Sequence, residues 1–171
     1  MIIKNKKAEK IIDNFLLNLV SYNENYLGNL NGLLNIKFDK LNNKLIKKGE
    51  IKLTINEKKI SIDEAKFIID KIGYINSKMS FEEDKGDLKF LTKNQLIIEN
   101  YIEFAKIFQI GSNKIKNIKH IHFDLEKEYG QTDFIIKNIK INNSKKNLKS
   151  NDVFLVKNIQ NLRSYIRELI N

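Results

Sequence analysis

The chain has 171 residues, with 31 basic and 21 acidic side chains, a formal charge of +10, and no cysteine or proline. This length and the 42 % share of hydrophobic residues fit one globular domain rather than a disordered segment, and the lack of cysteine excludes disulfides, zinc–thiolate sites and thiol chemistry. The positive charge would attract nucleic acid or phospholipid, but nearly all of it is lysine interleaved with acidic residues, so we expect no specific nucleic-acid binding.

The first predicted element is an amphipathic helix over residues 8–19, where apolar side chains recur at helical spacing. After residue 28 the apolar period changes to two, which is typical of half-buried strands, although Leu33 breaks the alternation. The pattern predicts strands at residues 30–38, 51–55, 60–69, 75–81, 88–90 and 96–98, separated by polar turns such as 56–59 and 83–87.

A second helix is predicted to interrupt this run of strands. Tyr101, Phe104 and Phe108 form an aromatic stripe at helical spacing, and Gly111 is expected to end the helix just after residue 110. Aromatic residues at this spacing favour a core position over a ligand platform.

The C-terminal part is predicted to hold two strands, at residues 121–125 and 134–141, a polar loop at 144–149, and a final helix. We expect the cap of that helix to be one of Ser150, Asn151 and Asp152. Its apolar stripe consists of Leu155, Ile159, Leu162, Ile166 and Leu169.

These patterns together predict an α+β fold that is mainly β, in a single domain spanning residues 1–171. The strands follow one another through short connections, which favours a twisted antiparallel meander of about seven to nine strands over a parallel sheet with crossovers. Helices are expected at both termini, with one more inserted after Ile98. The terminal helices should pack on the apolar sheet face or cap its ends, and the sequence leaves open whether this face is a groove or a covered core.

The candidates for chemistry are few. His120, His122, Asp124 and Glu126 point to one side of a predicted strand and could contribute metal ligands, but apolar residues alternate with them and the chain has no other histidine. A solvated strand face is the favoured interpretation, and no metal site is expected. The acidic cluster at residues 82–87 lacks the ligand spacing of a calcium-binding loop and is interpreted as a turn.

Motifs of catalysis and cofactor binding are not recognisable in the sequence. It contains no G-x-S-x-G elbow, no P-loop and no glycine-rich dinucleotide turn. The two histidines lie together in one segment rather than in an arrangement typical of a catalytic triad. We therefore expect a protein that is not an enzyme, with neither catalytic residues nor a cofactor.

Two long stretches resemble the C-terminal β-rich region of AsmA-like proteins. The first is LLNIKFDKLNNKLIKKGEIKLTIN (33–56) followed by KISIDEAKF (59–67). The second is LTKNQLIIENYIEFAKIFQI (91–110) followed by KIKNIKHIHFDLEKEYGQTDFIIKNIKIN (114–142). The likeness lies in the order of strands, the short aromatic helix and the closing strand, and it covers most of the chain from residue 30 to residue 170.

The resemblance implies an elongated β-sheet with a hydrophobic groove in the Gram-negative envelope, anchored in the inner membrane by an N-terminal helix. It implies a role in outer-membrane biogenesis and phospholipid transport, and no catalytic residues. No stretch of this chain has the roughly 20 apolar residues of a membrane-spanning helix. We therefore expect a periplasmic, C-terminal fragment of a longer AsmA-like protein, with the anchor outside this chain.

The expected function is that of a non-enzymatic envelope segment that contacts phospholipid or another acyl lipid. The candidate lipid-facing residues share one face of the predicted strands: Leu34, Ile36, Phe38, Ile51, Leu53, Ile55, Ile121, Phe123 and Leu125. The alternative is a stand-alone binding module for nucleic acid or protein, in which the basic charge is functional.

Overall fold

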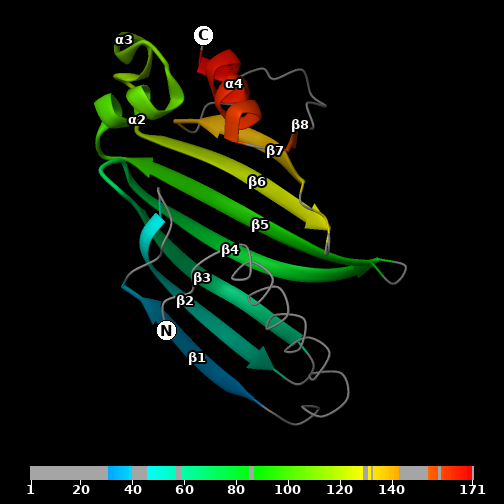
Figure 1. Ribbon diagram of the computed structural model, residues 1–171. Helices are drawn as coiled ribbons and strands as arrows, with labels where there is room; N and C mark the ends of the chain where they lie inside the picture. The colour runs from blue at the N-terminus through cyan, green and yellow to red at the C-terminus, as the bar shows by residue number, and fades with distance from the viewer. Residues whose placement is uncertain are drawn as a thin grey trace.

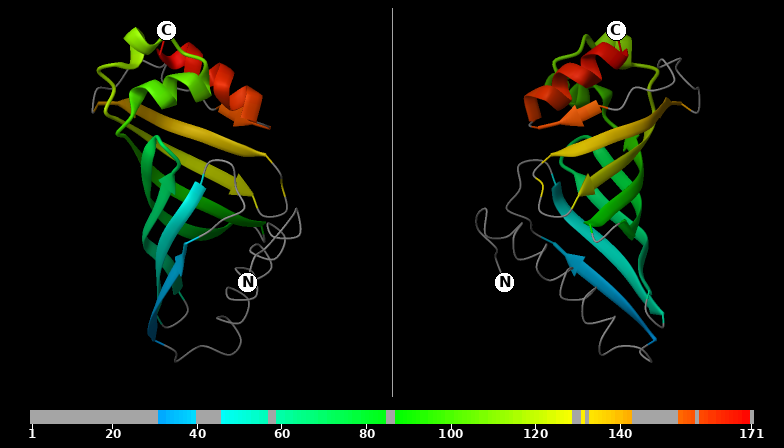
Figure 2. Two further views of the ribbon diagram at one scale, coloured as in Figure 1. Left: turned by 60° about the vertical axis from the view of Figure 1, so that its left-hand side comes forward. Right: turned by 90° about the vertical axis from the view of Figure 1, so that its right-hand side faces the viewer.

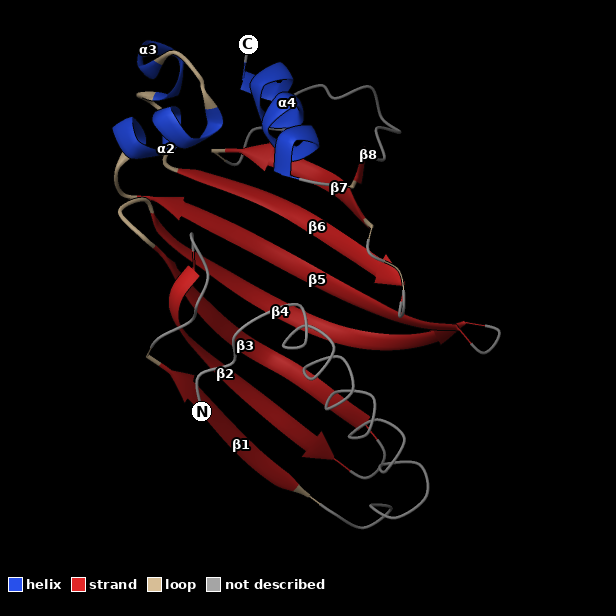
Figure 3. Cartoon of the chain, in the orientation of Figure 1, coloured by secondary structure: helices blue, strands red, loops and turns tan. Residues whose placement is uncertain are grey.

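The structure is a computed structural model that describes residues 31–39, 46–56, 59–84, 87–128, 131, 133–142, 154–157 and 159–170. The helix predicted for residues 8–19 and the loop predicted for 144–149 lie outside the described residues. Within the described part the chain forms a single open sheet with helices gathered at one end (Figures 1 and 3).

The sheet has eight antiparallel strands in chain order, each paired with its sequence neighbours. The strands are β1 (Gly32–Phe38), β2 (Ile46–Asn56), β3 (Lys59–Ile69), β4 (Gly73–Asp84), β5 (Asp87–Ile98), β6 (His120–Glu128), β7 (Phe134–Ile141) and β8 (Phe154–Val156). The helices are α2 (Tyr101–Phe108), α3 (Ser112–Ile115) and α4 (Ile159–Ile170). This architecture confirms the predicted antiparallel meander with one helical insertion after β5 and a helix at the C-terminus.

Strand β5 corrects one prediction, because the two short strands expected at 88–90 and 96–98 are one continuous strand. Alternation fails in the middle, where Thr92 and Asn94 stand at positions that face the same side as Phe90 and Leu96. The strand continues through them because β4 pairs with it at every residue along its length. Their side chains form hydrogen bonds on the apolar face of the sheet, so the polar residues do not end the strand.

Helix α2 begins as predicted, but it ends for a different reason. The side-chain oxygen of Asn100 accepts hydrogen bonds from the backbone N–H groups of Ile102 and Glu103, as an N-cap does. The left-handed residue that ends the helix is Gln109, with φ of 57°, and not Gly111. Gly111 instead precedes the single turn α3, which the sequence did not predict.

The C-terminal helix starts later than predicted. Residues 154–156 form β8, which pairs with the outer side of β7, and the helix begins at Ile159. The expected caps at residues 150–152 lie outside the described residues. Phe154 of β8 stacks on Tyr165 of α4, with ring centroids 3.9 Å apart, so tertiary packing holds this segment extended. Leu155, which was assigned to the helix stripe, is 47 % exposed on β8.

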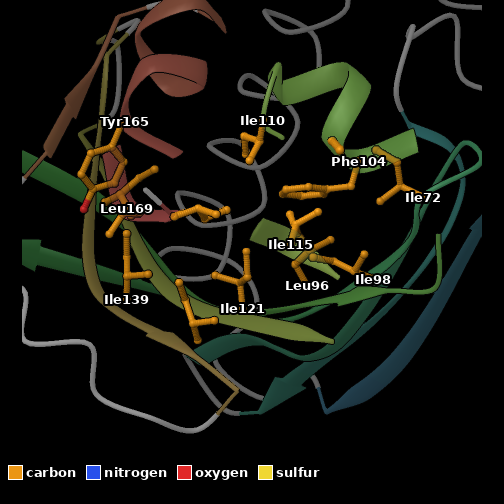
Figure 4. Close-up of a cluster of buried hydrophobic side chains, with 14 of the residues drawn as sticks. Ile72, Leu96, Ile98, Phe104, Ile110, Ile115, Ile121, Ile139, Tyr165 and Leu169 are labelled. Carbon is orange, nitrogen blue, oxygen red and sulfur yellow. The ribbon is translucent and has the colours of Figure 1, made fainter. Parts of the chain in front are cut away.

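The larger hydrophobic cluster lies where the helices meet the sheet. Phe104 and Ile115, both fully buried, come from α2 and α3 and lie over Leu96 and Ile121 of β5 and β6 (Figure 4). Helix α4 adds Leu169 to the same cluster. The prediction that the last helix packs on the apolar face is therefore confirmed. We call this cluster the helix-covered core.

A second, smaller cluster lies on β2 and β3. Its buried members are Leu53, Ile62 and Ala65, and half-buried residues of β2, β3 and β4 pack around them. No residue of the described helices belongs to it. We call it the β2–β3 cluster. The two views of Figure 2 show that the sheet twists strongly between this end of the molecule and the helical end.

Candidate functional site

The predicted lipid-facing residues all lie on one face of the sheet. Leu34 pairs with Leu53, and Ile36 pairs with Ile51, across β1 and β2. Antiparallel partners point to the same side, so each row of partners identifies a face. One such row runs through Leu34, Leu53, Ile62, Met79, Thr92, Leu125, Ile136 and Phe154. This row joins the β1, β2 and β6 candidates, and we call their common side the apolar face.

The candidates differ in how far they are covered. Leu53 and Ile121 are buried, with 1 % and 3 % of their surface exposed, and each belongs to one of the two clusters. Leu34 on β1 is 42 % exposed. The others are half-buried, namely Ile36, Phe38, Ile51, Ile55, Phe123 and Leu125. The apolar face is therefore buried at both clusters, and the most exposed of these candidates is Leu34, on the margin at β1.

A polar cluster interrupts the apolar face between its two hydrophobic clusters. The Ser77 hydroxyl donates to the Asn94 side-chain oxygen at 2.7 Å, and the Asn94 amide donates to Thr92 Oγ1 at 2.6 Å. That amide also reaches the carbonyl of Phe123 on β6 at 3.3 Å. Ser77 and Thr92 are each only 5 % exposed. Sequence reasoning missed this cluster, although the break in alternation within β5 was its signal.

At the β1 end the apolar face contains a glycine covered by an aromatic ring. Phe38 pairs with Gly49, and a side chain on Gly49 would collide with the Phe38 ring. Lying over the glycine, Phe38 also meets Phe67 on β3, with ring centroids 6.1 Å apart. A small residue between two large ones therefore lets the apolar surface continue from β3 to β1.

The opposite face is polar and carries both signs of charge. Lys52 pairs with Glu64 at 2.6 Å, Lys37 with Glu50 at 3.6 Å, and Lys137 with Glu126. The hydrogen bond from Asn35, assisted by the charge of Lys37, lowers the pKa of Glu50, while Glu64 raises the pKa of Lys52. Exposed pairs of this kind contribute little to stability. On this face, Lys37, Lys52 and Lys137 each lie beside an acidic partner.

A hollow of about 490 Å³ is lined by residues from β3 to β7, and the charged residues around it again have both signs. Asp63 at this hollow accepts hydrogen bonds from Thr54 at 2.8 Å and Ser61 at 2.9 Å. These two hydrogen bonds lower the pKa of the Asp63 carboxyl. Asp63 lies at the register shift of β3, and its hydrogen bond from Thr54 links that irregular point to β2. We therefore assign Asp63 a structural role.

The side chains of His120, His122, Asp124 and Glu126 lie on the polar face of β6. The rings of His120 and His122 are 5.4 Å apart in an edge-on arrangement. Asp124 accepts a hydrogen bond from Asn138 at 2.7 Å, and Glu126 is paired with Lys137. Among the residues that the structure describes, no group of three or more potential ligands could hold a metal ion.

The two remaining candidates take structural positions. The acidic residues at 82–84 lie where β4 meets β5, and the pairing of Asp84 with Asp87 closes a hairpin, which confirms the predicted turn. In the aromatic stripe of α2, Phe104 is fully buried and stacks on Phe108 at 4.4 Å. The interpretation of that stripe as core is confirmed.

No family model, no curated protein and no solved structure matches this chain. Within the described part, no helix has the length and apolar character needed to cross a membrane. The described part of the chain is thus classified by its fold alone. It is an open antiparallel meander with one apolar and one polar face, and helices cover one end of the apolar face.

Proposed function

We propose that this chain is a lipid-contacting segment of an AsmA-like envelope protein, which binds the acyl chains of phospholipid along its apolar face. The observation that supports this most directly is the exposed apolar margin of that face at β1. At β5–β7 helices cover it, whereas at β1 the apolar side chain of Leu34 is 42 % exposed on the same face. An apolar strip over β1–β3 with an exposed margin at β1 suits a long, unbranched hydrocarbon chain.

The chemistry of the two faces supports the same role. An acyl chain offers no hydrogen-bonding groups, so it requires apolar contacts and no charged partner. The β1–β3 end of the apolar face offers such contacts through Ile36, Ile51 and Phe67, all of which are half-buried. The polar cluster of Ser77, Thr92 and Asn94 lies at the inner end of this strip, where its hydrogen bonds are already made within the protein.

The proposal also includes the cellular setting that the resemblance implies: the periplasm of a Gram-negative cell, in a longer protein anchored in the inner membrane. The role there is passage of phospholipid during outer-membrane biogenesis, without catalysis. Expression in a Gram-negative host, purification in mild detergent and mass spectrometry of co-purifying lipids tests this setting. Phospholipid in stoichiometric amount supports it, and protein that carries no lipid contradicts it.

A pair of neighbouring substitutions tests the acyl site itself. Leu34→Asp places a carboxylate on the open part of the apolar face, where it can remain hydrated, so the fold should survive while binding of a fluorescent fatty-acyl probe falls. Leu33→Asp makes the same change one residue away on the opposite face, at a side chain that is 74 % exposed, and should leave binding unchanged.

Two further variants locate the closed part of the face. Leu53→Asp buries an unpaired charge at a side chain that is 1 % exposed and should unfold the domain, and Phe123→Asp should be less damaging because Phe123 is half-buried. Thermal melting is measured beside probe binding for each variant. Wild-type protein that binds no acyl probe, or equal loss of binding in Leu33→Asp and Leu34→Asp, contradicts the proposal.

A further inference from the structure

Helix α4 carries Arg163 and Arg167, the only arginines in a chain with 31 lysine and arginine residues. They are four positions apart, so their side chains leave the same side of the helix about one turn from each other. Both side chains are half-buried. A guanidinium differs from the ammonium of lysine because it offers a planar fork of donors that matches the oxygens of a carboxylate or a phosphate. The arginine pair is therefore a candidate anion-binding site.

Arg167 is oriented by two neutral side chains. Its guanidinium donates hydrogen bonds to Gln109 Oε1 at 3.4 Å and to Ser164 Oγ at 3.1 Å. Gln109 is the residue that ends α2, and α4 lies beside that helix at the helix-covered end of the sheet (Figure 1). Because neither partner is charged, these hydrogen bonds direct the side chain of Arg167 without neutralising it.

Arg163 is half-buried without a charged partner. Its Nε is buried and accepts no partner for its hydrogen. Among the residues that the structure describes, no ion pair joins either arginine to a carboxylate. Glu168 is exposed and directly follows Arg167, and adjacent residues of a helix do not face each other. The two guanidiniums thus keep an uncompensated charge in half-buried positions, which an anionic ligand would offset.

A purely structural role explains one arginine better than two. Arg167 contacts the residue that ends α2, where a cation offsets the partial negative charge at the carboxyl end of a helix. That role does not account for Arg163. A side chain that only covers the flank of α4 with its aliphatic part could equally be a lysine, which is the residue used at all other cationic positions of this kind in the chain.

We propose that Arg163 and Arg167 form a binding site for a phosphate group, of the kind carried by phospholipid headgroups and by soluble phosphate esters. A phosphate has more oxygens than a carboxylate, so it can accept hydrogen bonds from both forks at once. The site is separate from the apolar strip at β1–β3, because α4 packs beside β8 at the opposite edge of the sheet. Phosphate binding here therefore goes beyond the proposed acyl contact and does not depend on it.

NMR of isotopically labelled arginine tests the site directly, because a chain with only these two arginines gives one Nε–H signal for each. Titration with sodium phosphate should shift both signals along one saturating curve. Sodium chloride at the same ionic strength should not reproduce these shifts, since chloride cannot accept from both planar forks. Signals that do not move with phosphate, or that move equally with chloride, overturn the proposal.

A crossed pair of variants separates the forks from the charge. Arg163→Lys with Arg167→Lys keeps both charges but loses the planar forks, and should weaken phosphate binding roughly tenfold in the phosphorus NMR signal of the ligand. Lys116→Gln with Lys119→Gln removes two charges at exposed positions outside α4, and should leave the dissociation constant within about threefold of wild type.

Thermal melting checks that both double variants are folded. Should the arginine double variant be unfolded, Arg163→Lys alone replaces it, because the hydrogen bonds to Gln109 and Ser164 belong to Arg167. Weakening by the lysine variant that equals or exceeds that of the arginine variant shows general attraction by the basic surface and overturns the proposal.

Co-sedimentation with vesicles identifies the source of the phosphate. Binding to vesicles of phosphatidylglycerol and phosphatidylcholine in equal parts, lost in the arginine variant, assigns the site to a lipid headgroup. Binding of inorganic phosphate without binding to vesicles assigns it to a soluble phosphate ester, and protein that binds neither overturns the proposal. The arginine variant should bind the fluorescent fatty-acyl probe as wild type does, so failure of this site and failure of the apolar strip are distinguished.

Discussion

The two ends of the sheet show how one strand pattern can produce two kinds of packing. At β5–β7 the apolar face is closed by α2, α3 and α4, and Phe104 and Ile115 are completely buried against it. On β2 and β3 the buried cluster has only Leu53, Ile62 and Ala65, and strand residues alone surround it within the described part. The same alternation of residues therefore specifies a face, and that face is buried beneath helices at β5–β7 and, within the described part, among strand residues at β2–β3.

The largest effect is expected in the helix-covered core. Phe104→Ala removes a ring that is fully buried and stacked on Phe108, and should lower the free energy of unfolding by about 3–5 kcal/mol in a denaturant titration. Leu34→Ala, on the exposed margin of the same face, serves as the matched control and should change it by less than about 1 kcal/mol. Comparable losses in both variants would mean that the two ends are equally closed.

The next effect concerns the β2–β3 cluster. Leu53→Ala should destabilise by about 2–4 kcal/mol, because the side chain is 1 % exposed and leaves a cavity among strand residues. Native-state hydrogen exchange should show the loss mainly in the amides of β1–β3, with smaller changes at β5–β7. A uniform loss of protection throughout the sheet would show that both ends unfold as one cooperative unit.

The polar cluster at the boundary between the two ends should have an intermediate effect. Asn94→Ala leaves the buried hydroxyls of Ser77 and Thr92 without their shared partner, and should lower stability by about 1–3 kcal/mol. Replacing all three together, with Ser77→Ala, Thr92→Val and Asn94→Leu, removes donors and acceptors at once and should recover much of that loss. Urea titration of both variants measures the difference, and a triple variant less stable than Asn94→Ala would contradict this account.

The smallest effect is expected at the β3 register shift, as a change in acid sensitivity. Hydrogen bonds from Thr54 and Ser61 hold the pKa of Asp63 below its ordinary value of 3.8. A depressed carboxyl pKa contributes stability above the unfolded-state value and loses it as the pH falls through the folded-state value. Asp63→Asn should therefore reduce the loss of melting temperature below about pH 4.

Thr54→Ala removes the larger of the two hydrogen-bond contributions and provides the second variant for the same measurement. It should also flatten the acid limb of the pH–melting curve, by less than Asp63→Asn does. An acid limb that is unchanged in both variants would contradict the role assigned to this carboxylate.

Much of the fold could be predicted because apolar and polar residues alternate with a period of two along most strands. The alternation fails where polar residues occupy the apolar face, as in β5. Where local sequence and tertiary contact disagreed, prediction failed. The polar residues Thr92 and Asn94 indicated a break between two strands. They lie inside one continuous strand, where Asn94 forms hydrogen bonds with Ser77 of β4 and with the backbone carbonyl of Phe123 on β6. Leu155 was assigned to the apolar stripe of the last helix, yet pairing with β7 holds residues 154–156 extended.

The sequence predicted which residues share the apolar face, but not how far each of their side chains is exposed. Alternation assigns Leu34 and Leu53 to the same side, and the register agrees. Nothing in the alternation distinguishes a side chain that is 42 % exposed from one that is 1 % exposed, because exposure depends on what covers the face. The left-handed residue Gln109 was missed for a related reason, since glycine is only the commonest of the residues that end a helix in this way.

The chain-order pairing of the eight strands has a consequence for how such a sheet can change in length. Each strand forms backbone pairs only with its sequence neighbours, so a hairpin can be inserted or removed at a turn without threading the chain or reversing a crossover. Local pairing also lets the sheet form progressively from one hairpin to the next, as expected for a fold with many short-range contacts. Gain or loss of hairpins in evolution would then lengthen or shorten the apolar strip in steps of two strands, while the helix-closed end keeps its own core.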